Sequence, residues 1–243
     1  MSHIHLPDGV LPVWLWASGF AAAVLIWAIF FRLMKKKDLA RRLPLLGMMG
    51  AAMILGASVE IIPIAYHVNL TVVSGILLGP ALIFLATFVV NLILALFGHG
   101  GITVIGLNTL ILSIEGILAY FFFHLFHAVF RRVVVATFIA TFLALLFSTL
   151  AMIGVLSLGV SHYEELIHHR SEGGFLEVKL LKEHDHDQGK EWKEREINLK
   201  RFIAVILPLS LVGWVLEGLI SALIIRYIHR LRPELLRLTR GSS

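Results

Sequence analysis

The sequence predicts an all-α polytopic membrane protein with about seven transmembrane helices. Two observations are compositional: 58% of the 243 residues are hydrophobic, with a mean hydropathy of +0.87, and only 15% are charged. A soluble domain carries about 25% charged residues. The third observation is the spacing of long apolar runs, which are divided by shorter polar segments. A single membrane domain over residues 1–243 accounts for this length.

The first two apolar runs set the expected orientation. One extends from Leu11 to Met34 and is long enough to cross a bilayer. Lysine and arginine residues between positions 32 and 42 follow it, and the positive-inside rule makes that segment cytoplasmic and the N-terminus external. The second run, about Leu45 to Ile64, starts after Pro44, a residue suited to the first turn of a helix, and Pro63 is expected to end it.

The apolar stretch from Leu70 to Phe97 is interrupted by Leu78-Gly79-Pro80. It is compatible with one kinked helix or with two segments. A single crossing would place Arg131-Arg132 outside, whereas two crossings place this pair in the cytoplasm. We therefore predict two segments, about 68–79 and 81–97. The first is too short for a full span, so we expect it to be tilted or packed within protein.

Three further spans are predicted at 105–130, 133–160 and about 202–228, and arginine residues after the last one indicate a cytoplasmic C-terminus. The hydrophilic segment 161–200 is predicted to be an extracytoplasmic loop. It contains five histidines interleaved with acidic residues. This pattern is typical of a weak metal-collecting tract, and equally of a solvated loop.

A few polar side chains fall inside the predicted spans. Glu115 and Glu217 are candidates for function, because a carboxylate within a span is rare, although a buried hydrogen-bonded carboxylate is an equal alternative. Asn108 lies in the same span as Glu115. His124 and His127 share a helix face close to the basic end of that span, and we interpret them as interfacial residues.

The N-terminal segment 1–10 is the strongest candidate metal site in the residues themselves. His3 and His5 lie beside the terminal amine and the backbone amides, and such nitrogen atoms suit Ni(II), Cu(II) or Co(II). The alternative is a solvated terminus with incidental histidines. No removable leader is expected, since no lysine or arginine precedes the first run, and Ser2 is small enough to permit removal of Met1.

Several chemistries are excluded. The chain has no cysteine, so a metal ion must be held by nitrogen or oxygen atoms. No Walker-type loop, Gly-x-Ser-x-Gly elbow or His-Glu-x-x-His pair occurs. The basic residues gather at helix ends, so nucleic acid is not an expected partner. Metal-ion transport or capture is the favoured function, and a metal-dependent membrane enzyme or a histidine-loop sensor or scaffold stays open.

Three groups of motifs stand in the first half of the chain. They are His5-Leu6-Pro7-Asp8-Gly9, then His67 with the sequence from Gly75 to Pro80, and then the sequences 98–103 and 106–108. The first resembles the N-terminal His-Ile-Pro-Asp-Gly signature of the CbiM/NikM family, and the other two are similar to its second and third blocks. This family comprises the substrate-binding membrane components of energy-coupling-factor cobalt and nickel transporters.

The resemblance implies a ligand set. In the family the ion is bound by the terminal amine, a backbone amide and the imidazole of an N-terminal histidine, and by an imidazole from another loop. The last role falls on His67. The family's usual start has histidine directly after Met, so Ser2 and His3 depart from the pattern, and His3 and His5 remain alternative ligands. Loss of Met1 would let Ser2 supply the amine.

The resemblance implies further roles and partners. Asn69, His99 and Asn108 are expected to orient ligands by hydrogen bonding rather than to bind the ion. The expected partners are a transmembrane coupling component, cytoplasmic ATPase subunits and, in many members, a small two-helix membrane subunit. The chain itself is expected to be no enzyme and to carry no cofactor. The transported ion is Co(II) or Ni(II), and the sequence does not choose between them.

Overall fold

The fold is helical, as the sequence predicts. A computed structural model describes residues 11–33, 36–58, 60–61, 66–98, 100–159 and 199–238. Its helices are α1 (Val13–Leu33), α2 (Lys36–Ser58), α3 (Thr71–Leu78), α4 (Pro80–Leu96), α5 (Ile105–Phe130), α6 (Val133–Gly159), α8 (Leu199–Leu231) and α9 (Pro233–Leu238). Two short strands, β1 (Glu60–Ile61) and β2 (Tyr66–His67), pair antiparallel between α2 and α3. The N-terminal segment 1–10 and most of the loop 161–200 lie outside the described residues.

Five of these helices are long and apolar enough to cross a membrane. The spans are Val13–Arg32, Leu39–Ser58, Ile105–Phe130, Val133–Val155 and Ser210–Leu231. The apolar helix α4 is shorter. Helix α3 has 8 residues, or about 12 Å of helix, and cannot cross a hydrocarbon layer about 30 Å thick. The chain is thus a multi-pass membrane protein, while the number of full crossings and the orientation of its ends stay predictions.

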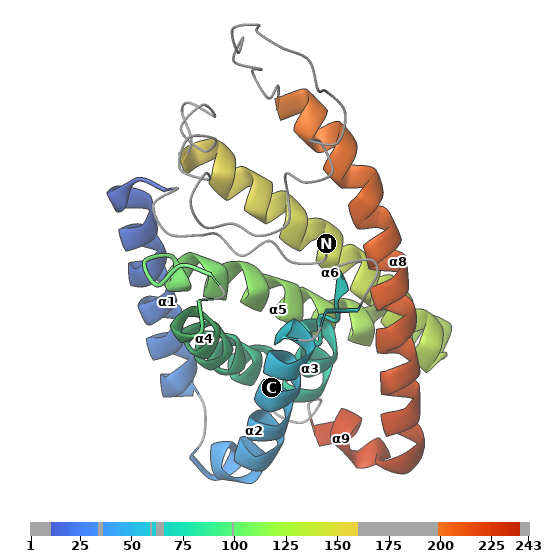
Figure 1. The fold of residues 1–243 in the computed structure, drawn as a ribbon. Coiled ribbons are helices and arrows are strands. Elements are labelled where there is room, and N and C mark those ends of the chain that lie inside the picture. Colours follow the sequence, from blue (N-terminus) through green and yellow to red (C-terminus); the bar gives the residue numbers. More distant parts are fainter. Residues whose placement is uncertain are drawn as a thin grey trace, which may run out of the picture.

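Helix α5 lies at the centre of the bundle. It packs against α6, α3, α4 and α1, and α6 in turn packs against α8. Figure 1 shows α5 running across the molecule between α1 on one side and α8 on the other. Segments far apart in the sequence therefore meet on α5, which makes it the scaffold for any site built from several loops.

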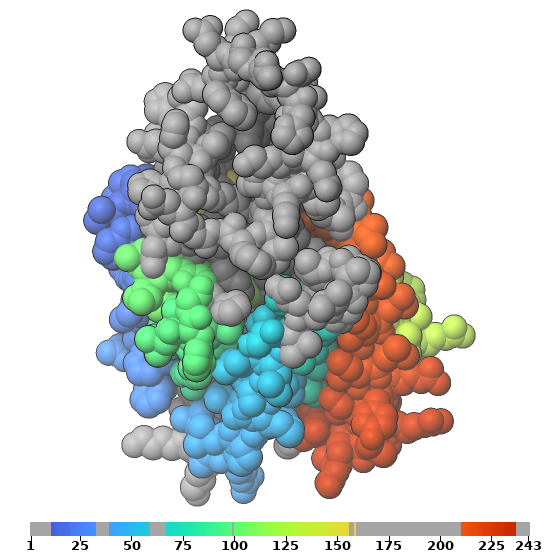
Figure 2. Space-filling model, in the orientation of Figure 1, coloured from blue at the N-terminus to red at the C-terminus, as the bar shows by residue number. Residues whose placement is uncertain are grey.

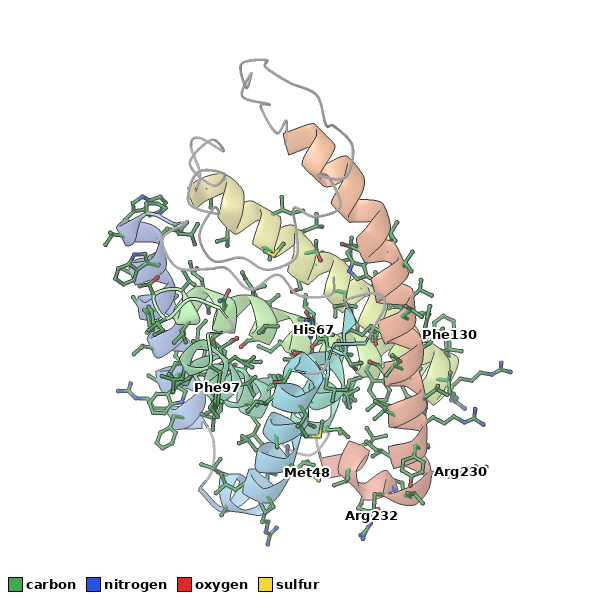
Figure 3. All side chains as sticks on the ribbon, viewed as in Figure 1. Met48, His67, Phe97, Phe130, Arg230 and Arg232 are labelled. Atoms are coloured by element: carbon green, nitrogen blue, oxygen red, sulfur yellow. The ribbon has the colours of Figure 1, made fainter. Side chains whose placement is uncertain are left out.

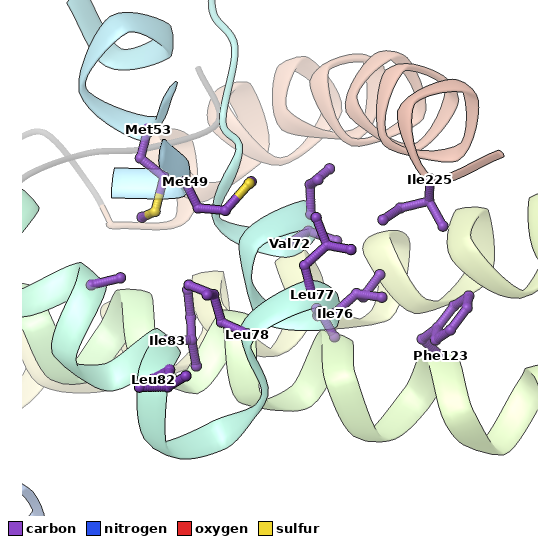
Figure 4. Packing of buried hydrophobic residues seen from close by; sticks show 14 of the residues in the cluster. Met49, Met53, Val72, Ile76, Leu77, Leu78, Leu82, Ile83, Phe123 and Ile225 are labelled. Atoms are coloured by element: carbon purple, nitrogen blue, oxygen red, sulfur yellow. The ribbon is translucent and has the colours of Figure 1, made fainter. Parts of the chain in front are cut away.

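The main core surrounds the short helix α3. All eight residues of α3 are buried, which confirms the prediction that this segment packs within protein. Figure 4 shows its side chains between those of α2, α4, α5 and α8. The residues labelled there are Met49, Met53, Val72, Ile76, Leu77, Leu78, Leu82, Ile83, Phe123 and Ile225.

The break between α3 and α4 lies where the sequence predicts it. Gly79 has a φ of 78°, a conformation that glycine adopts without the steric cost that a side chain would bring. Pro80 is the first residue of α4, where its missing N–H leaves no hydrogen bond unmade. The interpretation as two segments is therefore confirmed, and the single kinked helix is wrong.

Helices α3 and α5 cross in backbone contact. A Cβ atom added to Gly75 would lie 2.7 Å from the Cα and carbonyl carbon of Gly116. One added to Gly116 would lie 3.4 Å from the carbonyl oxygen of Thr71. Small residues permit such close approach in membrane bundles. The start of α3 is thus pressed against the middle of α5.

The outer surfaces of the bundle are apolar. Large exposed hydrophobic side chains lie on α1 and α8, including Trp14 and Leu25 on α1 and Val212 and Leu223 on α8. Figure 2 shows these two helices at opposite sides of the molecule, with α2 in front. Apolar surface of this extent suits contact with lipid rather than with water.

Four predicted boundaries are wrong. Helix α2 begins at Lys36, so Pro44 lies inside it. The residues before Pro44 are good helix formers, and transmembrane helices tolerate proline. The same helix ends at Ser58 instead of Ile64, because Glu60 enters the strand pair. At the other end of the chain, α8 begins at Leu199, two residues before the predicted end of the loop 161–200. The last span was predicted to end at about 228, whereas α8 continues to Leu231 and is followed by the short helix α9.

Candidate metal site

His67 ends strand β2. Its Cα partner across the short antiparallel ladder is Glu60, and Tyr66 pairs with Ile61. The His67 side chain is half-buried. Figure 3 shows His67 in the middle of the bundle, at the end of β2 beside α3. The ladder brings the chain back after α2 and directs the following residues into the interior.

Asn69 is buried and is fixed at both ends of its side-chain amide. Its Oδ1 atom accepts a hydrogen bond of 2.8 Å from the backbone N–H of Thr71, at the start of α3. Its Nδ2 atom donates a hydrogen bond of 2.5 Å to Oε1 of Glu115 on α5. Because the Thr71 N–H requires an oxygen acceptor, the orientation of the amide is set by its partners. The segment after His67 is therefore tied to α5.

Glu115 is fully buried in the middle of the molecule. Besides Asn69, the Ser148 hydroxyl of α6 interacts with its carboxyl group. The same hydroxyl lies 3.5 Å from the carbonyl oxygen of Ile111, one turn earlier on α5. A buried carboxyl group needs such hydrogen bonds to offset the loss of water. One side chain thus links the His67 segment, α5 and α6.

Glycine residues make room for this segment. A Cβ atom added to Gly56, near the end of α2, would lie 2.5 Å from the carbonyl oxygen of Val68. On the other side, Gly116 follows Glu115 directly, and a Cβ atom added there would lie 3.4 Å from the Thr71 carbonyl oxygen, an ordinary contact distance. The residues from His67 to Thr71 are therefore held between α2 and α5. His67 is therefore placed by its pairing with Glu60 and by the packing of Val68 and Asn69, the two residues that follow it.

Asn108 lies on the same buried face of α5. It is seven residues before Glu115, which corresponds to two helical turns, or about 10 Å along the axis. Two polar pairs also join α4 and α5: Thr87 with Ser113 at 2.6 Å, and Asn91 with Thr109 at 3.3 Å. The buried polar side chains of α5 therefore lie on two sides of the helix: Thr109 and Ser113 contact α4, and Glu115 contacts Asn69.

The remaining candidate residues fall into two groups, those outside the described residues and those within them. Ser2, His3, His5 and His99 lie outside the described residues, so their predicted roles are untested. His124 and His127 contact aromatic neighbours: Nδ1 of His124 lies 2.8 Å from the carbonyl oxygen of Tyr120, and the His127 ring stacks on Phe123. Glu217 is fully buried on α8. Within the described ranges, no three His, Asp or Glu side chains gather as a metal-binding group.

The sequence alone did not single out Ser148. Ser148 is one of several hydroxyl residues in an apolar helix, and its contact with Glu115 depends on the packing of α5 on α6. A usable signal was present for Asn69 and Thr71, because an asparagine two residues before a helix start often accepts a hydrogen bond from the backbone there. The intramembrane position of Glu115 was the other signal.

Comparison with known proteins identifies the family. The model of the CbiM family, described as the cobalt uptake substrate-specific transmembrane region, matches residues 5–235. The chain is 28% identical over 242 residues to the cobalt transport protein CbiM of Geobacter sulfurreducens, covering 96% of this chain and 61% of that protein. It is 34% identical over 130 residues to the cobalt transport protein CbiM of Sorangium cellulosum, covering 50% of this chain and 58% of the relative. The chain thus spans about three-fifths of the length of these relatives.

Solved structures share the fold. The chain is similar to a transition metal transporter with a TM-score of 0.69 and 21% identity, covering 99% of this chain and 98% of the other. It is also similar to a truncated transition metal transporter with a TM-score of 0.67 and 19% identity, covering 93% and 99%. These likenesses support the helical arrangement described above. Since the family model matches nearly the whole sequence, the chain belongs to the CbiM family of cobalt uptake substrate-specific transmembrane regions.

Proposed function

We propose that this chain captures Co(II) or Ni(II) from the outside of the membrane and presents it for uptake. The observation that carries the proposal is the family match, which begins at His5 of the N-terminal signature and runs through His67 to residue 235. The names of the relatives from G. sulfurreducens and S. cellulosum, both cobalt transport proteins, support uptake rather than catalysis. An ion-capturing role also accounts for a histidine held within a membrane bundle.

The ligands in this proposal are nitrogen atoms from two parts of the chain. Segment 1–10 contributes the terminal amine, a backbone amide and the imidazole of His3 or His5, and strand β2 contributes the imidazole of His67. If Met1 is removed, the terminal amine that binds the ion is that of Ser2. An all-nitrogen set of this kind suits Ni(II) and Co(II). The anchored position of His67 supports the proposal, because it offers the mobile metal ion one ligand at a fixed place.

Uptake would be driven by partner proteins. We propose a transmembrane coupling component, cytoplasmic ATPase subunits and a small two-helix membrane subunit. One similar protein, from Methanocorpusculum labreanum, is named a putative fused cobalt transport protein CbiMQ, and this chain covers 36% of it at 27% identity. A relative in which further sequence is fused to the CbiM part supports association with a second component. In this account the chain performs no ATP hydrolysis and is not an enzyme.

Extending the N-terminus tests the proposed site. A tag before Met1 removes the amine from its place, so we expect it to abolish high-affinity Ni(II) and Co(II) binding by the purified chain, as measured by isothermal titration calorimetry. The same tag after Ser243 is the matched control and should leave binding unchanged. Mass analysis of the untagged protein shows whether Met1 is retained. Equal affinity of the two tagged proteins would exclude the terminal amine as a ligand.

Binding should depend on pH. Protons compete with the ion for imidazole and amine nitrogens, since both must be neutral to bind it. Free histidine protonates at about pH 6.5 and an α-amino group at about pH 8. We therefore expect the affinity for Ni(II) to fall as the pH is lowered from 8, and to fall most steeply below about 6.5. Titrations at fixed ionic strength measure this, and a constant affinity from pH 8 to 5 would argue for carboxylate ligands.

A further inference from the structure

Glu115 is a buried carboxyl group on α5 that is hydrogen-bonded to the segment carrying the proposed metal ligand. Glu115 is joined to His67 through Asn69, which is two residues from His67 and is hydrogen-bonded to Glu115 at 2.5 Å. The two residues Asn69 and Glu115 are 46 positions apart in the sequence. This is a contact between a span and the segment that carries the proposed ligand.

The contact has little freedom to move. The other end of the Asn69 amide is held by the Thr71 N–H at 2.8 Å, so the side chain cannot turn without losing a buried hydrogen bond. Glu115 is held in turn by its place in the middle of α5, the helix against which α3 and α6 pack. Both Asn69 and Glu115 are almost completely buried, at 5% and 0% exposure. Water is therefore a poor substitute for either partner.

The backbone on the N-terminal side of Asn69 is packed closely, so the positions of Asn69 and His67 depend on each other. The Val68 carbonyl, between His67 and Asn69, lies against Gly56 of α2. His67 itself is paired with Glu60 in the strand ladder. A displacement of Asn69 must therefore also displace the backbone that carries His67, because the segment is short and packed on both sides.

We infer that Glu115 is a positioning residue for the captured ion: acting through Asn69, it sets the place of the His67 imidazole and hence how tightly the ion is held. The inference rests on the proposed function, in which His67 binds the ion. Groups that orient a metal ligand typically change metal affinity by about 10- to 100-fold when they are removed. The start of α3 uses only the Oδ1 atom of Asn69, and packing in an apolar bundle requires no carboxyl group, which is why a ligand-orienting role fits this pair.

The test exchanges the two partners. Asn69→Asp removes the Nδ2 donor and sets two carboxyl groups against each other, and Glu115→Ala removes the acceptor. We expect each to weaken Ni(II) binding by about 10- to 100-fold and to shift the d–d absorption of the bound ion. The double variant Asn69→Asp/Glu115→Gln restores a hydrogen bond in the opposite direction, from the new amide to the new carboxylate, while the Thr71 N–H keeps its acceptor. We expect it to recover the affinity and the spectrum.

The control is a second buried polar pair of α5. Ser113 is two residues before Glu115 and contacts Thr87 of α4 at 2.6 Å, so Ser113→Ala also removes a buried hydrogen bond within the bundle. It should leave the affinity and the d–d absorption unchanged. All variants are compared as full-length protein in detergent, with size-exclusion profiles and thermal midpoints recorded. Asn69→Asp is nearly isosteric with the natural residue, so it keeps the test informative if Glu115→Ala does not fold.

The outcomes separate the inference from the proposed function. The proposed function and the role of Glu115 are both supported if the natural chain binds the ion, His67→Ala loses binding, Asn69→Asp weakens it and the double variant restores it. Binding that is lost in His67→Ala but unchanged in Asn69→Asp, or not restored by the exchange, overturns the role of Glu115 alone. A natural chain that binds neither Ni(II) nor Co(II) overturns the proposed function and this inference with it.

Discussion

His67→Ala is expected to abolish high-affinity binding of Ni(II) and Co(II). The substitution removes the imidazole of a residue that pairs with Glu60 in the strand ladder, and the next two residues, Val68 and Asn69, contact α2 and α5. The remaining proposed ligands would all come from segment 1–10, and an incomplete set holds the ion weakly. We expect the loss to exceed the factor of about 100 that removal of a ligand-orienting group can cause. Calorimetric titration of the purified chain measures it.

The matched control for His67→Ala is His124→Ala. His124 lies nine residues after Glu115 on the same helix, about 13 Å further along its axis, and its ring rests on Tyr120. Removing it deletes an imidazole from α5 without touching the segment that carries His67. We expect the affinity of this variant to equal that of the natural chain. If the two substitutions had the same effect, the binding site would lie elsewhere.

Gly75→Ala is expected to destabilise the fold strongly. The added methyl group would overlap the Gly116 backbone, with its carbonyl oxygen nearest and its Cα and carbonyl carbon at 2.7 Å, and a backbone cannot rotate away as a flexible side chain can. Helices α3 and α5 would have to separate, which would disturb the core around α3 and the contact between Asn69 and Glu115. Overpacking of this kind costs about 3 kcal/mol. The thermal midpoint in detergent should fall, and metal binding should weaken with it.

Gly47→Ala provides a control of opposite sign. A Cβ atom at Gly47, in the interior of α2, would meet nothing within 4 Å. Alanine is favoured over glycine inside a helix by about 0.5–1 kcal/mol, so this variant should be as stable as the natural chain or slightly more stable. A similar loss of stability in both variants would show that glycine flexibility, rather than the close crossing of α3 and α5, matters.

Hydropathy and helix signals predicted most of the fold. The bounds 105–130 agree with α5, and the break at Gly79-Pro80 was correctly located because both residues have a specific backbone requirement there. The start of α2 was wrong because hydropathy marks where a helix enters lipid, whereas the helix itself begins earlier, among charged residues that are good helix formers. The strand pair between α2 and α3 has only two residues on each side, too few to give an alternating pattern.

The candidate site was predictable in its residue types but not in its connections. Asn69 and Glu115 each attracted attention, one for its place after His67 and the other for its charge within a span. Nothing in a single sequence pairs residues 46 positions apart, and their hydrogen bond depends on the crossing of α3 over α5 at Gly75 and Gly116. The contacts between helices therefore decide which of these residues meet, and the sequence motifs do not reveal this.

The account's central claim is that the beginning of the chain and His67 hold one ion together. The most direct test is the structure of the full chain loaded with Ni(II) or Co(II), with the ion located by anomalous scattering at its absorption edge. We predict a single strong peak bonded to nitrogen atoms of residues 1–5 and to the His67 imidazole. A peak bound elsewhere, with the N-terminal residues remote from His67, would contradict the claim.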